Sequence, residues 1–148
     1  MKHPALRGFD PRRLADARAA AGMTVGDLAR MSGVGPSAIY NWESGYRTPQ
    51  PDSIARVASA LGLTIEEFVR IPLGERTLVD LRVMAGLTQP QLAMRIGLST
   101  QMLGMIERAE RALDDERATA LAHELGVSLE VVRAGYERAR IRPPGTPA

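Results

Sequence analysis

The strongest constraint on this chain is an internal repeat. Residues Arg12 to Arg70 align with Arg76 to Ala134 without a gap, at an offset of 64 positions. The identical pairs include Leu14/Leu78, Asp16/Asp80, Arg18/Arg82, Gly22/Gly86, Thr24/Thr88, Leu28/Leu92, Ala29/Ala93, Gly33/Gly97, Glu43/Glu107 and Gly62/Gly126. A repeat of this length is longer than a single solenoid unit. The chain is therefore a duplicated small domain.

Composition points to helices. Aromatic residues make up only 4% of the 148 positions, whereas alanine, leucine, arginine and glutamate, which favour helices, are abundant. The absence of cysteine excludes disulfides, thiolate zinc sites and a cysteine nucleophile. No apolar run approaches the roughly 20 residues that span a bilayer. We expect an all-α protein that is cytoplasmic and has no membrane segment.

Each copy is expected to form five short helices. In the first copy, helix-capping or helix-opening residues stand at Asp10, Thr24, Pro36, Asp52 and Thr64. Thr24 with Asp27 has the spacing of a capping box, which Thr88 and Gln91 repeat in the second copy. The matching starts and stops predict the same fold twice.

Domain boundaries follow from this pattern. We predict an N-terminal module over residues 9–70, a short linker over 71–75 and a C-terminal module over 76–142, with flexible tails at 1–8 and 143–148. The last helix is expected to open at Ser128 and stop before Pro143. Its apolar residues predict either a dimerisation surface or a helix folded onto the second module.

The order of motifs resembles the Cro and lambda-repressor (XRE-like) helix-turn-helix family. In the first copy the resemblance rests on Arg18, Leu28, Ala29, Gly33, Val34, Ile39, Trp42, Glu43, Gly45, Arg47, Pro49, Leu61 and Gly62. It implies an all-α fold of two tandem five-helix lambda-repressor-like modules. It further implies a sequence-specific regulator of transcription, repressor-like, that binds double-stranded DNA. Such a protein is expected to be bacterial or phage-encoded and nucleoid-associated when bound.

The same resemblance assigns site residues, because the third helix of such a module enters the major groove. In the first copy the implied DNA contacts are Thr24, Val25, Pro36, Ser37, Tyr40, Asn41, Tyr46 and Arg47. In the second copy they are Thr88, Gln89, Thr100, Gln101, Met105 and Arg111. Arg18 with Glu43, and Arg82 with Glu107, are implied to be structural ion pairs.

The two copies differ at these positions. Gly104 and Met105 replace Tyr40 and Asn41 on the third helix. Formal charge also differs, being +2 over the first 72 residues and zero over the remainder. We therefore expect the first copy to be the principal DNA reader, although Gln89 gives the second copy a polar residue where the first has Val25.

Other kinds of site have little support in the sequence. His3 and His123 are isolated, so no metal site or cofactor is expected. The acidic run from Asp114 to Glu116 suits a helix start, and no catalytic constellation is present, so we do not expect an enzyme. The alternative function is a protein-interaction or antitoxin-type regulator, in which the C-terminal module forms a homodimer or binds a partner protein.

Overall fold

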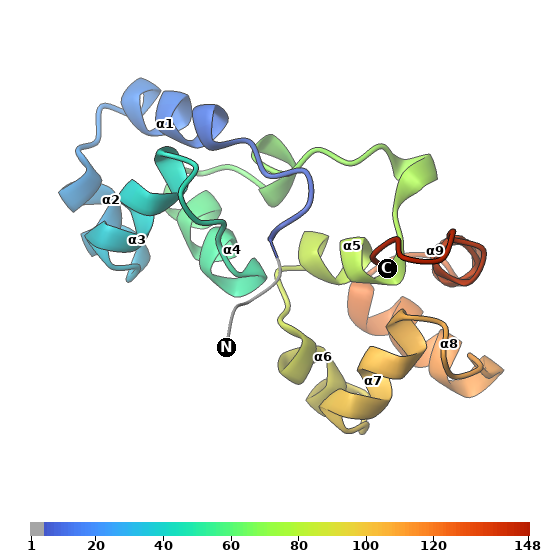
Figure 1. Ribbon diagram of the computed structural model, residues 1–148. Helices are drawn as coiled ribbons and strands as arrows, with labels where there is room; N and C mark the ends of the chain where they lie inside the picture. The colour runs from blue at the N-terminus through green and yellow to red at the C-terminus, as the bar shows by residue number, and fades with distance from the viewer. Residues whose placement is uncertain (1–4) are drawn as a thin grey trace. The chain divides into compact units, whose positions relative to one another are not determined.

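The computed structural model describes residues 5–148, and the chain divides into two compact units between Ile71 and Pro72. Every regular element in residues 5–148 is helical, and the only β-pairing there is one isolated bridge. Figure 1 shows the helices of both units. The prediction of an all-α fold is confirmed.

The first unit is built from four α-helices and one 3-10 turn. They are α1 (Pro11–Ala20), α2 (Val25–Ser32), α3 (Pro36–Glu43), α4 (Pro51–Ala60) and η1 (Ile65–Glu67). The side chains of Asp10 and Thr24 accept backbone N–H groups at the starts of α1 and α2, as the sequence predicted. Helical spacing turns apolar side chains inward, and the buried core includes Leu14, Leu28, Ile39, Trp42, Ile54, Val57 and Phe68.

The fifth element of this unit is shorter than expected. The side chain of Thr64 makes no capping hydrogen bond, and η1 ends after a single turn. Beyond it, the Arg70 N–H donates to the Gly8 carbonyl and the Phe68 carbonyl accepts from Asp10 N–H, so the chain is held extended there. Pro72 also disfavours helix at the residue before it.

The segment before α1 is packed, which differs from the flexible tail expected over 1–8. Leu6 is buried, and its backbone N–H donates to Thr48 Oγ1 at 2.8 Å. Gly8 has φ +77°, and a Cβ added there would lie 2.7 Å from the Arg70 carbonyl oxygen. Only glycine fits this close approach. Residues 1–4 of the predicted tail lie outside the described residues.

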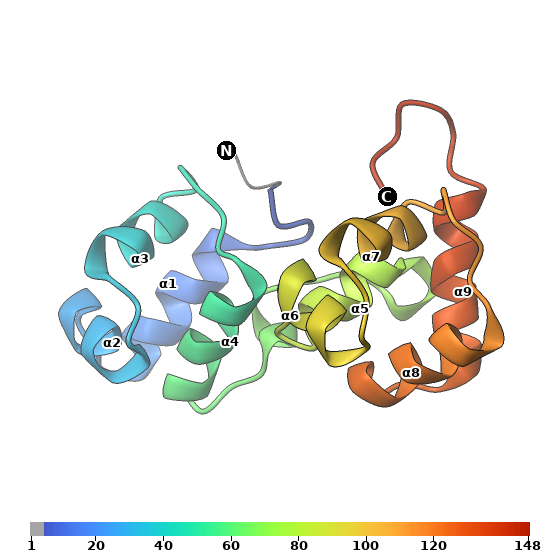
Figure 2. The ribbon, with the colours of Figure 1, turned by 90° about the horizontal axis from the view of Figure 1, so that it is seen from below.

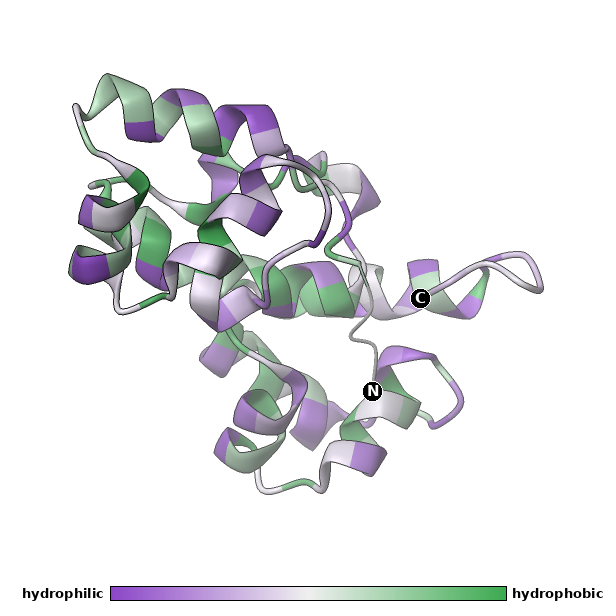
Figure 3. Ribbon diagram, turned by 60° about the vertical axis from the view of Figure 1, so that its left-hand side comes forward, coloured by the Kyte–Doolittle hydropathy of each residue, from purple (hydrophilic) through white to green (hydrophobic). Residues whose placement is uncertain are grey.

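The second unit repeats the framework with a longer final helix. Its elements are η2 (Leu73–Glu75), α5 (Leu78–Met84), α6 (Gln89–Arg95), α7 (Thr100–Glu107), α8 (Asp115–Leu125) and α9 (Leu129–Arg140). Its core consists of Leu78, Leu81, Leu87, Leu92, Ala93, Leu103, Ile106, Ala118, Leu121, Leu125 and Val132. Hydrophobic and hydrophilic residues alternate along the helices of both units in Figure 3.

Helix α9 packs on the second unit itself. It contacts α5, α7 and α8, and Figure 2 shows it beside them. Val132 and Ala139 have no exposed surface, and the Arg138 guanidinium donates to the Arg76 carbonyl at 2.8 Å. Folding onto its own module, one of the two predictions for this helix, is therefore observed, and the dimerisation surface stays a prediction. In the segment after α9, Arg142 Nε donates to the Thr146 carbonyl, and residues 143–147 are exposed, so the flexible tail over 143–148 stays a prediction.

Candidate nucleic-acid interface

The turn between α2 and α3 is fixed by two small residues. Gly33 takes φ 75° at the end of α2, a left-handed conformation that suits glycine. The buried Ser32 hydroxyl donates to the Leu28 carbonyl at 2.6 Å and accepts the Val34 N–H at 3.2 Å. Ala29 is buried as well. Together they hold α3 at a fixed angle to α2.

Helix α3 presents a polar outer face. Ile39 and Trp42 turn into the core, with 0% and 6% exposure. Tyr40 is 63% exposed, Ser37 is exposed and Asn41 is half-buried. The inner face thus anchors the helix while its first turns remain available to a ligand. Pro36, the other predicted contact on α3, is exposed at its first position.

The loop after α3 adds a positive charge beside this face. Tyr46 is 74% exposed, and the Arg47 guanidinium lies 5.6 Å from the centre of its ring. Arginine stacks favourably on aromatic rings, and its planar fork suits phosphate. Both side chains are exposed, so their contact with the DNA backbone stays a prediction.

The start of α2 differs from the expectation at one residue. Thr24 is exposed and caps the helix through Asp27 N–H at 3.0 Å, whereas the Val25 side chain is only 7% exposed. The side chain of Val25 faces the core and is not a DNA contact. What this position offers to phosphate is the backbone N–H at a helix N-terminus.

An ion pair holds α3 to α1. Arg18 donates from Nε and Nη2 to the two carboxylate oxygens of Glu43, both at 2.7 Å, and from Nη1 to the Met23 carbonyl at 2.9 Å. The hydrogen bond to Glu43 raises the pKa of Arg18. The predicted pairing is present, and it fixes the C-terminal end of α3.

The matching pair in the second unit is more deeply buried. Arg82 donates to Glu107 at 2.7 and 3.3 Å, and Glu107 is 1% exposed. Gln89 adds a third hydrogen bond, from Nε2 to Glu107 Oε1 at 2.8 Å. The Gln89 amide therefore points to the interior pair, which differs from the phosphate contact expected for it. In the first unit Val25 stands at this position.

Helix α7 presents a different outer face from α3. Thr100 and Gln101 are exposed at its start, Met105 is half-buried, and Gly104 is buried although it aligns with the exposed Tyr40. Side chains from outside the helix cover Gly104. A Cβ at that glycine would lie 3.0 Å from Arg108 Nη1 and 3.3 Å from Gln89 Nε2.

The loop after α7 begins with a charged residue, Arg108, that the sequence analysis did not assign to the site. Arg108 donates to both carboxylate oxygens of Glu110, at 2.9 and 3.1 Å, and this bond lowers the pKa of Glu110. The predicted contact Arg111 is exposed, and its carbonyl accepts the Tyr136 hydroxyl at 3.1 Å. The exchange of Ser44 and Tyr46 for an arginine and a glutamate was the available signal in the sequence.

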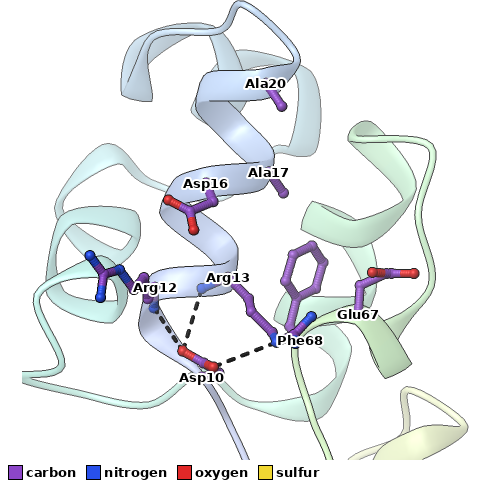
Figure 4. Close-up of a pocket in the computed structure, with 8 residues that line it drawn as sticks. All are labelled: Asp10, Arg12, Arg13, Asp16, Ala17, Ala20, Glu67 and Phe68. Atoms are coloured by element: carbon purple, nitrogen blue, oxygen red, sulfur yellow. Dashed lines mark hydrogen bonds and ion pairs between the residues drawn. The ribbon is translucent and has the colours of Figure 1, made fainter.

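A pocket in the first unit lies away from these residues. Its lining comes from α1 and the segment around η1, and it includes Asp10, Arg12, Arg13, Asp16 and Glu67 (Figure 4). Asp10 caps α1 by accepting the N–H groups of Arg12 and Arg13, so part of this charge is already paired within the helix. None of the predicted DNA contacts lines it.

These features define a DNA-binding class: two copies of a helix-turn-helix with an anchored third helix. The family model described as helix-turn-helix matches the chain twice, over residues 14–68 and 78–132. The chain belongs to this XRE-like family of DNA-binding regulatory domains, with two tandem copies. No curated protein matches it.

Residues 5–148 also differ from the patterns of membrane-spanning helices and of metal sites. None of their helices is both long and apolar enough to cross a bilayer. In the same part of the chain, no group of three or more histidine, aspartate or glutamate side chains is arranged to bind a metal ion.

Proposed function

We propose that the chain is a sequence-specific transcriptional regulator, repressor-like in action, that reads double-stranded DNA in the major groove. One observation carries this proposal. The inner face of α3 is fixed to the unit by Trp42 and the Arg18–Glu43 pair, while Tyr40 and its polar neighbours lie on the outer face. A rigid helix with an exposed polar first half is what base reading in the major groove requires.

The residues of α3 and of the loop after it have separate roles in this proposal. Asn41 pairs with adenine through its amide, and Ser37 donates or accepts at a base edge. Tyr40 contacts a base or the neighbouring phosphate. Arg47, stacked on Tyr46, holds the backbone, and so does the N-terminus of α2. Phosphate contacts position the protein, and the α3 residues supply specificity.

The first unit is the principal reader in this proposal. Its formal charge of +2 exceeds that of the second, and its α3 keeps tyrosine and asparagine where α7 has Gly104 and Met105. The absence of catalysis is part of the same proposal, because the residues with named roles bind and do not react. A cytoplasmic location is also proposed.

The test is selection from random DNA duplexes by the whole chain, followed by titration of the enriched sequence. The double variant Tyr40→Ala, Asn41→Ala is expected to lose at least about a hundredfold in affinity for that sequence while keeping weak salt-sensitive binding. Ser59→Ala, an exposed serine on α4, is the matched control and should bind normally. Equal affinity of the double variant and wild type would reject the assignment.

A second candidate is protein binding through the second unit. Met94, at the end of α6, is 82% exposed, the highest value among the exposed large hydrophobic residues of the described chain. Flexible exposed methionines suit adaptable protein contacts. This role predicts self-association or capture of a partner that Met94→Gln weakens. A monomeric wild type over a wide concentration range in light scattering would contradict the homodimer.

A further inference from the structure

At the middle of α7, the guanidinium of Arg108 lies over Gly104, whereas α3 has the tyrosine side chain at this position. Gly104 aligns with Tyr40, the central outward residue of α3. Glycine in the middle of a helix costs about 0.5–1 kcal/mol relative to alanine, so its presence there calls for a reason. A Cβ at Gly104 would lie 3.0 Å from Arg108 Nη1, so the glycine gives the guanidinium room to lie against the helix.

Arg108 is the residue directly after α7, and its side chain extends back to the middle of that helix. Its Nε and Nη2 atoms donate to Glu110 as a two-pronged fork, at 2.9 and 3.1 Å. The two side chains are 47% and 51% exposed. An ion pair this exposed is weak, because water competes for both partners. The two donors of Arg108 are therefore already oriented side by side, and another acceptor can replace Glu110.

We propose that Arg108 is the base-reading side chain of the second unit, donating its fork to a guanine in the major groove once Glu110 releases it. This proposal rests on the proposed function and names the residue by which the second unit contributes to it. Guanine O6 and N7 form the acceptor pair that an arginine fork fits best among base edges. Met105, the other central position of α7, has no donor to offer.

Glu110 acts as the competing acceptor. Its carboxylate occupies Nε and Nη2, one of the donor pairs that a guanidinium can present to guanine, and it also adds a negative charge that DNA would repel. Arg142 lies close enough to contribute to the lowered pKa of Glu110, so a second cation remains near this carboxylate when Arg108 leaves it. Arg142 lies beyond the residues that the family model matches, so this feature is particular to the extended second unit.

The first experiment is selection from random duplexes by wild-type chain and by Arg108→Ala. The variant is expected to lose preference for guanine at one position, by about ten- to a hundredfold, and to keep the rest of the motif. Its thermal midpoint should match wild type because the lost ion pair is exposed. An unchanged motif would overturn the proposal, and so would uniform weakening with a salt slope lower by about one, which marks a phosphate contact.

The second experiment tests the exchange. Glu110→Gln is expected to bind the selected sequence several-fold more tightly than wild type, because the fork is less firmly held and a repulsive charge is gone. In the double variant Arg108→Ala, Glu110→Gln, most of that gain should disappear. A gain of the same size without Arg108 would show general charge relief and would overturn the competing-acceptor role.

A third variant separates the site from the stability of the fold. Gly104→Ala should favour the helix while displacing Arg108 and Gln89 by a few tenths of an ångström, so the guanine preference should fall without loss of folded protein. A retained preference would contradict the proposal. If wild type enriches no sequence at all, the proposed function itself fails. If it enriches a motif that Arg108→Ala preserves, only this inference fails.

Discussion

The two units differ in the side of the third helix on which their polar side chains lie. In the first, Val25 fills the core, the Arg18–Glu43 pair is partly exposed, and α3 keeps its own polar side chains outward. In the second, Gln89 bonds to the buried Glu107 and covers α7. At the start of the second helix, the first unit therefore has an apolar side chain in the core, whereas the second has an amide bonded to the interior ion pair.

The final elements show a second contrast. In the second unit α9 lies on α5, and Gly135 allows the approach because a Cβ there would lie 3.3 Å from the Leu78 backbone N. In the first unit η1 is one turn long, and the α1 face of Figure 4 carries Asp16 and Arg13 beside small alanines. A charged face without large apolar groups has little to gain from a covering helix.

The largest expected difference concerns the two ion pairs. Glu107→Ala leaves a buried arginine without its carboxylate and should destabilise the second unit by about 3–5 kcal/mol. Glu43→Ala should cost the first unit less, about 1–3 kcal/mol, because its partner keeps contact with water. Chemical unfolding separates them, since Trp42, the single tryptophan, reports on the first unit while circular dichroism reports on both.

The same experiment contains its own control. Glu107→Ala should leave the fluorescence transition of Trp42 in place, and Glu43→Ala should move it. Equal losses in the two units would mean that the difference in burial has no energetic weight.

A smaller effect is expected at the turn that follows each third helix. Gly45 has φ 77°, and Ala109, its counterpart, has φ 58°, the only positive φ of a non-glycine residue in the described chain. Gly45→Ala should destabilise the first unit by about 1 kcal/mol, because a Cβ strains this conformation. Ala109→Gly should relieve this strain and stabilise the second unit by about 0.5 kcal/mol. The gain is smaller than the strain itself because glycine also gains freedom in the unfolded chain.

Thermal unfolding of both variants measures this pair of effects. Opposite signs are the expected result. A loss of stability in Ala109→Gly would show that the alanine side chain makes packing contacts worth more than its strain.

The smallest effect concerns pH at the caps of α2 and α6. Hydrogen bonds from Thr24 lower the pKa of Asp27 below its ordinary 3.8, whereas Gln91 at the matching position does not titrate. A lowered pKa means that the folded state favours the ionised carboxyl. The stabilisation is therefore complete above the ordinary aspartate pKa and is lost as pH falls through the lower folded value.

Amide exchange monitored by NMR at acidic pH tests this difference between the caps. Protection at the start of α2 should weaken in that range in wild type and stay constant in Asp27→Gln. Protection at the start of α6 should not respond through its cap. Identical acid responses at both caps would contradict the assignment to Asp27.

Much of this was readable from the sequence, because the signals were local or duplicated. Caps such as Thr24, the turn glycine Gly33 and the core position of Trp42 follow from spacing and from the repeat. The pairs of Arg18 and Arg82 with their glutamates came from the family resemblance. These features depend on residues that each copy carries in the same place.

The rest depends on side chains that meet through folding. The inward turn of Gln89 needs the position of Glu107, 18 residues later, and the cover over Gly104 needs the path of Arg108. The packed segment before α1 depends on its pairing with residues around Arg70, far along the chain. Periodicity and local propensity contain no information on such contacts.

The central claim, that the first unit dominates DNA reading, is tested most directly by one selection experiment. Random duplexes are enriched in parallel by wild type, by Tyr40→Ala with Asn41→Ala in α3, and by Thr100→Ala with Gln101→Ala in α7. The account predicts that the α3 variant loses the motif and that the α7 variant keeps most of it. A motif that survives the α3 changes and disappears with the α7 changes would contradict the account.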